Sequence, residues 1–141
     1  MPIAVYATEG LLSSAAEKKA FKELTAALLK QLDLVGNTFL TPNVIGEIHI
    51  IPKGQTFSGG EPNDIVVVEL KIPSFALATL DQKQGFISEA TDIFVTAAGG
   101  KLPKERIFVN MVYTVDGFWG IAGKAYTNAQ LGEAVQMAAA A

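Results

Sequence analysis

The sequence of 141 residues predicts an α+β fold in which a strand–helix–strand unit occurs twice, in the order βαββαβ. Two long segments carry apolar residues at spacings of three and four, which is typical of helices packed along one side. Short β-branched runs flank both segments, and the first strands of the two halves begin about 62 residues apart, at Ile3 and Ile65. A helix between two strands of one sheet makes them parallel. We therefore expect a four-stranded sheet with both helices on one face, followed by a C-terminal hairpin or arm.

The first half begins with a strand. Residues 3–7 form a short apolar run that is partly β-branched and closed by a glycine. Ser14 and Glu17 then have the spacing of a capping box, which satisfies free N–H groups at a helix start. The apolar stripe that follows predicts a helix over about residues 14–34. Residues 44–51 predict the second strand.

The second half has the strongest strand signal of the chain, over residues 64–72. Its near-continuous Val, Ile and Leu content predicts burial on both faces of the sheet. Helical spacing returns over residues 77–98, and residues 106–114 predict the fourth strand. The glycine-rich and aromatic residues 116–126 predict a small hairpin or extended arm, and residues 128–137 one or two helical turns.

We expect a single domain over residues 1–141, with halves at about 2–52 and 64–114, an arm at 115–127 and a C-terminal tail at 128–141. Four strands with both helices on one face leave the other face bare, which an oligomer or another layer would cover. Charged residues make up 18% of the chain, below the roughly 25% of typical soluble domains. This low content also predicts that some surface is hidden in an oligomer.

Composition excludes several classes of function. The chain has no cysteine and one histidine, His49, so thiol chemistry is excluded and a metal site is not expected. The formal net charge of −3 does not indicate binding to nucleic acids. No targeting signal or membrane-spanning run is visible, so we expect a cytoplasmic protein. Gly99-Gly100-Lys101 is interpreted as the end of a helix rather than an anion-binding loop.

Four short motifs occur in a characteristic order. Met1-Pro2-Ile3 leads directly into a strand, and it is followed by EIHIIP at 47–52, FSGGEP at 57–62 and RIFVN at 106–110. Together they resemble the tautomerase superfamily over about residues 2–126. The spacing is similar to that of the longer members, the macrophage migration inhibitory factor and cis-type chloroacrylate dehalogenase branches.

The resemblance implies a tautomerase-like βαββαβ subunit, a homotrimer, no cofactor, and an active site at Pro2 near a subunit boundary. A terminal amine titrates near pH 8, and burial lowers its pKa. Neutral Pro2 could then act as a general base that isomerises a small keto or enol acid. The alternatives are a hydratase or lyase with protonated Pro2 as the acid, and a non-catalytic tautomerase-like or ferredoxin-like binding protein. Catalysis by Pro2 requires that Met1 be removed, because an amide nitrogen is not basic.

The resemblance also suggests five pocket residues, each with a structural alternative. Asn110 could hydrogen-bond a substrate carbonyl or join two strands, and Lys71 could bind an anionic substrate or be an ordinary exposed lysine. Phe108 is expected to pack along the wall of the pocket and not to act as an acid. Trp119 could line the pocket from an adjacent subunit or pack in the interface. Tyr113 is a weaker donor candidate, with packing as its alternative.

Three departures from the dehalogenase pattern argue against that reaction. Leu28 occupies the place of a helix histidine, residues 70–75 contain no arginine, and Arg106 is the only arginine in the chain. Without bidentate arginine pairing a dicarboxylate would be held weakly. An apolar or aromatic keto/enol acid, similar to phenylpyruvate, is the expected substrate.

Overall fold

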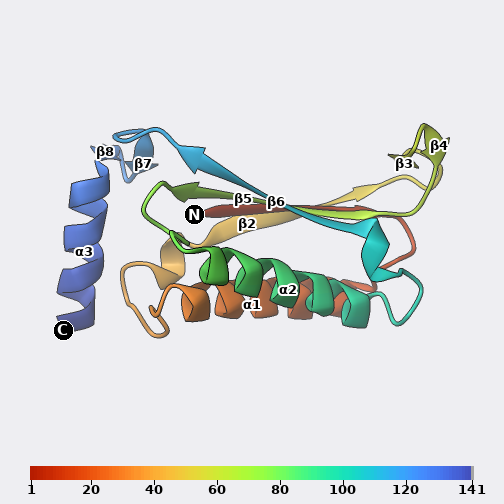
Figure 1. Ribbon diagram of the computed structural model, residues 1–141, viewed down its shortest axis with the longest axis horizontal. Helices are drawn as coiled ribbons and strands as arrows, with labels where there is room; N and C mark the ends of the chain where they lie inside the picture. The colour runs from red at the N-terminus through yellow and green to blue at the C-terminus, as the bar shows by residue number, and fades with distance from the viewer. Residues whose placement is uncertain (141) are drawn as a thin grey trace.

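The structure is a computed structural model that describes residues 1–140, and it has the expected four-stranded sheet (Figure 1). The strands are β1 (Pro2–Thr8), β2 (Ile45–Ile51), β5 (Val66–Pro73) and β6 (Ile107–Thr114), in the order β2-β1-β5-β6. Each half is a parallel pair, β1 with β2 and β5 with β6. The two halves meet where β1 and β5 run antiparallel. The predicted fold class is confirmed.

Two helices of 18 residues, α1 (Ser14–Gln31) and α2 (Leu80–Ala97), cover one face of the sheet (Figure 1). The predicted cap of the first helix is one residue too late. Ser13 is the N-cap, and its hydroxyl accepts a hydrogen bond of 3.1 Å from the backbone N–H of Ala16. Ser13 has extended backbone geometry, which an N-cap requires, whereas Ser14 already lies within the helix.

Smaller elements complete the chain. They are η1 (Thr41–Asn43), β3 (Phe57–Ser58), β4 (Glu61–Pro62), η2 (Lys104–Arg106), β7 (Trp119–Ile121), β8 (Lys124–Tyr126) and α3 (Asn128–Ala140). The pairing of β7 with β8 confirms the expected small hairpin. The C-terminal helix is longer than the one or two turns expected from sequence. Ala141, the last residue of the predicted tail, lies outside the described residues.

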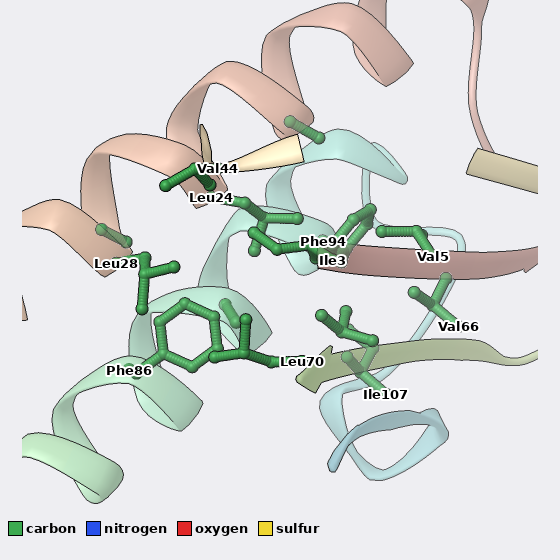
Figure 2. Packing of buried hydrophobic residues seen from close by; sticks show 14 of the residues in the cluster. Ile3, Val5, Leu24, Leu28, Val44, Val66, Leu70, Phe86, Phe94 and Ile107 are labelled. Carbon is green, nitrogen blue, oxygen red and sulfur yellow. The ribbon is translucent and has the colours of Figure 1, made fainter. Parts of the chain in front are cut away.

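The core lies between the sheet and the two helices (Figure 2). Alternate residues of the two central strands point toward the helices, and α2 contributes two fully buried rings. The fully buried side chains include Ile3, Val5, Val66, Val68, Leu70, Ile72, Leu24, Leu28, Leu77, Phe86 and Phe94. Burying such side chains is the main favourable term in folding.

The other face of the sheet is open in the single chain, so the expectation that residues 64–72 are buried on both faces is wrong for the isolated subunit. Burial along β5 alternates from Val66 to Lys71. The open face carries large apolar side chains: Ile45 is 57% exposed, Val112 56% and Phe108 43%. Half-buried Tyr6 and Val67 belong to the same face, which also carries Glu47, Glu69 and Lys71. We call it the open sheet face.

No helix among residues 1–140 is both long and apolar enough to span a membrane.

Replacing Gly46 by alanine tests the packing of β2 against β1. An added Cβ would lie 2.0 Å from the backbone oxygen of Ile3 and 2.5 Å from the Phe21 ring. Because the backbone contact cannot yield without moving a strand, we expect Gly46→Ala to lower the free energy of unfolding by about 1–3 kcal/mol or more. Urea unfolding followed by circular dichroism measures this. Gly132→Ala is the matched control, since no atom lies within 4 Å of its added Cβ. Equal stability of the two variants would contradict the packing described.

Candidate functional site

A cavity of about 290 Å³ lies at the N-terminal end of β1. The N-terminus, the β7–β8 hairpin and α3 all lie at this end of the sheet (Figure 1). Loops after α1 and after β5 form its other walls. Its apolar lining includes Leu32, Leu34, Phe39, Leu40, Phe75, Leu77, Trp119, Ile121, Leu131 and Val135. Among the described residues no Asp, Glu, Lys or Arg side chain lines it, so a charge within this cavity is poorly solvated.

Asn37 holds the loop after α1 against the C-terminal helix. Its side-chain oxygen accepts hydrogen bonds from the backbone N–H groups of Phe39 (3.2 Å) and Leu40 (2.8 Å). Its side-chain nitrogen donates to the carbonyl of Val135 at 2.9 Å. This 5% exposed amide therefore joins two walls of the cavity that lie about 100 residues apart in sequence.

The terminal amine of Met1 lies in this cavity and donates a hydrogen bond to the carbonyl of Asn43. Burial disfavours the charged form and lowers the pKa of the amine from 8.0 to about 6. At pH 7 the folded chain therefore carries a mostly neutral amine there. A neutral, partly desolvated amine is a competent proton acceptor.

Pro2 is the first residue of β1 and pairs with Ile45 of β2. The antiparallel ladder between β1 and β5 ends at Ile3 and Leu70, so one step further Pro2 lies opposite Lys71. Pro2 and Lys71 belong to the same face of the sheet, the open one, and neighbouring strands are about 5 Å apart. In a chain without Met1, the Pro2 nitrogen would become the terminal amine, close to the present cavity and to Lys71.

Trp119 lies in β7 and lines the cavity of its own chain. Its indole nitrogen is buried and has no hydrogen-bond partner among the described residues. Buried donors are rarely left unpaired in proteins, so this N–H is available to an acceptor of a bound molecule.

The other three candidates lie away from the cavity within one chain. Asn110 pairs with Glu69 on β6, two strands from β1, and Phe108 pairs with Val67. Phe108 is in line with Tyr6, four residues and so about 13 Å along β1 from Pro2. Asn110 and Tyr113 instead line a separate hollow of about 340 Å³. Within one chain Pro2 thus lies opposite Lys71, and Trp119 lines the cavity that holds the Met1 amine. Asn110, Phe108 and Tyr113 lie elsewhere.

Sequence reasoning missed the contribution of α3, which places Leu131 and Val135 against the cavity. Their spacing of four residues was the available signal, since it is typical of one helix face. It also missed Asn43, which acts through its backbone carbonyl and therefore has no signature in the side-chain pattern. No group of three or more His, Cys, Asp or Glu side chains within residues 1–140 has the arrangement of a metal site.

The sequence matches no protein-family model, and no curated protein is significantly similar to it. Solved structures are similar in fold. A wild-type fused 4-OT solved as a symmetric trimer has a TM-score of 0.75 at 15% identity, covering 94% of this chain and 99% of that one. N1, a member of the cis-3-chloroacrylic acid dehalogenase family, has a TM-score of 0.76 at 19% identity, covering 94% of this chain and 88% of its own.

FG41 malonate semialdehyde decarboxylase, solved with the inhibitor 3-bromopropiolate, has a TM-score of 0.66 at 12% identity, covering 86% of this chain and 89% of its own. All three are tautomerase-superfamily proteins, and this chain has their fold. The resemblance suggested by the four sequence motifs is therefore confirmed at the level of the fold.

The lowered pKa of the terminal amine predicts selective labelling. In a chain that retains Met1, an amine-selective acylating reagent should modify the terminus with a half-maximal rate near pH 6, because burial destabilises the ammonium form. Mass spectrometry of the N-terminal peptide measures the rate as a function of pH. The same chain in denaturant is the control and should titrate near pH 8. Identical midpoints in both states would show that the amine is not desolvated.

Proposed function

We propose that this protein is a cofactor-independent tautomerase that uses Pro2, exposed by removal of Met1, as a general base. The observation that carries the proposal is the terminal amine in an apolar cavity, with its pKa lowered to about 6. The fold shared with a fused 4-OT supports the same class of reaction. A secondary amine in place of the present primary amine would experience similar desolvation.

The proposed step is a proton transfer within a bound 2-oxo or enol acid. Neutral Pro2 accepts a proton from the carbon next to the carbonyl, and the electron pair of that C–H bond moves to form the enolate. Return of the proton to oxygen, or to another carbon of the conjugated system, gives the isomer and regenerates the neutral amine. No net oxidation occurs, so the reaction requires no redox cofactor.

The lining of the cavity indicates the kind of substrate. Its walls are mainly aliphatic and aromatic, which favours an apolar or aromatic body. Lys71, exposed on the same sheet face as Pro2, could hold the carboxylate, and the unpaired indole N–H of Trp119 could donate to a substrate oxygen. With one cation near Pro2 and no arginine, a monocarboxylate such as phenylpyruvate is favoured over a dicarboxylate.

The proposed assembly is a homotrimer in which open sheet faces are covered by neighbouring subunits. Ile45, Phe108 and Val112 are exposed there, and large exposed apolar side chains are typical of interfaces. Charged and polar residues of the same face, such as Glu47 and Glu69, lie between them. The fused 4-OT with this fold is itself a trimer. Asn110 and Phe108, which lie on this face away from Pro2 in one chain, could then reach a neighbour's site across the subunit boundary. Tyr113 lies on the helix side of β6, beside Lys83.

Two alternatives involve the same fold. Proteins of this fold include a dehalogenase-family member and a decarboxylase, so a hydratase or lyase with protonated Pro2 is the second candidate. Burial lowers the pKa of the Met1 amine, and a Pro2 amine desolvated in the same way would favour the base over the acid at neutral pH. A non-catalytic binding protein is the third.

Comparing the same chain with and without Met1 tests the role of Pro2. We expect only the trimmed chain to ketonise phenylenolpyruvate, because acylation by Met1 leaves the Pro2 nitrogen without basicity. Pro2→Ala still allows methionine removal but replaces the secondary by a primary amine. We expect it to lower kcat/KM by about 10²- to 10⁴-fold, the usual contribution of a positioned base.

Intact mass establishes the state of the terminus in each preparation, and Val35→Ala, at an exposed loop position, is the control for unspecific loss. For a base, kcat/KM should rise with pH through the pKa of the free amine, whereas for an acid it should fall. Full activity of Pro2→Ala, or of the chain with Met1, would refute the proposed catalysis.

A charge on the open sheet face should disrupt the assembly. We expect native mass spectrometry to give three times the chain mass for the unmodified protein, and monomers for Val112→Lys, because burying an unpaired ammonium is costly. Val35→Lys is the matched control, since Val35 is exposed but lies in the loop after α1. A monomeric unmodified protein, or a trimer that tolerates Val112→Lys, would contradict the proposed interface.

A further inference from the structure

The two halves of the fold are arranged so that each has its own hollow. The central strands β1 and β5 are antiparallel and pair around Val5 and Val68, so their first residues lie at opposite ends of the sheet. The cavity at Met1 is formed by the start of β1 and the loop after α1. The equivalent position in the second half, at the start of β5 and the loop after α2, also holds a cavity, of about 400 Å³. Pro62 of the β3–β4 hairpin lines this second cavity. The hairpin lies at the end of the sheet remote from the N-terminus (Figure 1).

The second cavity differs from the first in charge. Lys53, Lys101 and Arg106 line it, together with a single carboxylate, Asp64. The cavity is thus cationic in a chain whose formal net charge is −3.

Asp64 neutralises only one of the three cations. Both of its carboxylate oxygens accept hydrogen bonds from the Lys53 ammonium, at 2.8 and 2.6 Å. The Lys101 ammonium donates to the carbonyl of Gly10 at 3.0 Å, which holds its position without cancelling its charge. The Arg106 side chain, which is half-buried, has no hydrogen bond or ion pair among residues 1–140. Glu9 lies nearby and accepts from the Lys53 backbone N–H, but it does not line the cavity.

The shape of the cavity complements these charges. Leu102 is 3% exposed, and with Pro62 and Pro103 it supplies an apolar wall. An arginine fork and a lysine beside an apolar wall suit a compact anion with a planar or tetrahedral head, since the guanidinium can donate two parallel hydrogen bonds.

We propose that this cavity is a second ligand site, which binds a small dianion such as a dicarboxylate or a phosphate through Arg106 and Lys101. The site is separate from the cavity at Met1, and the inference does not depend on the catalysis proposed for Pro2. Gly99 and Gly100, with φ of 60° and 80°, do end α2 as the sequence predicted, and Lys101 contributes through its side chain.

Titration of the full chain with malonate and, separately, with inorganic phosphate tests the proposal. We expect saturable binding in ¹H–¹⁵N spectra, with amide shifts at Gly54, Lys101 and Leu102 larger than those at Ala76 and Gly132 beside Met1. The tighter of the two probes identifies the head group as carboxylate or phosphate. Absence of saturable binding for both, or shifts confined to the Met1 cavity, would overturn the proposal.

Matched variants then show which cations bind the anion. Arg106→Gln should weaken binding by about tenfold or more, the effect of losing a charge-assisted hydrogen bond. Lys104→Gln removes the same charge from the same 3₁₀ turn, but Lys104 does not line the cavity and should change affinity less than about threefold. Lys101→Gln repeats the test if Arg106→Gln does not fold.

A third variant should act in the opposite direction. Asp64→Asn frees the Lys53 ammonium and removes the one carboxylate of the cavity, so binding should tighten severalfold. Exposed ion pairs contribute little to stability, so the variant should fold. Equal effects of Arg106→Gln and Lys104→Gln, or no change in Asp64→Asn, would show an ordinary solvated surface instead of a site.

Discussion

The antiparallel pairing of β1 with β5 is the constraint on which the rest of the structure depends. Because each half is a βαβ unit, the start of its first strand and the loop that follows its helix lie at the same end of the sheet. Joining the halves through antiparallel first strands sends these two ends in opposite directions. The molecule consequently has two hollows with related architecture and no shared wall, one at Met1 and one at Asp64.

Chemical differences between the hollows follow from the segments added to each. The hairpin β7–β8 and α3 close over the cavity at Met1 and add apolar side chains, so that the terminal amine is desolvated. The cavity beside β5 is lined by three basic side chains, Lys53, Lys101 and Arg106, together with an apolar wall. Desolvation favours a neutral base, whereas an open cationic hollow favours an anion that retains part of its hydration. One scaffold can thus present two kinds of site at its opposite ends.

The open sheet face is the surface through which we propose that subunits assemble. The sequence segment 64–72 reads as a strand buried on both sides, while the isolated chain covers only the side toward the helices. On the open side β5 presents Val67, Glu69 and Lys71, so Val67 is the residue of these three that burial by a neighbouring subunit would favour. Asn110 and Phe108 lie away from Pro2 within one chain, and in the assembly that we propose they would approach a neighbour's site across the subunit boundary.

The sequence by itself determined the order of the strands and helices, the apolar side of each helix, and the placement of Pro2 at the start of a strand. These features follow from local periodicity and from the residues typical of helix ends and turns. Both signals depend on residues that are close together in the sequence. Only the tertiary structure decided that the Met1 amine donates to the Asn43 carbonyl and that Leu131 and Val135 close the cavity around it. The tertiary structure also decided that Lys53, Lys101 and Arg106 line the second cavity. Those contacts join segments that lie tens of residues apart in the sequence. The segments meet because distant strands pair, and no local sequence pattern encodes that pairing.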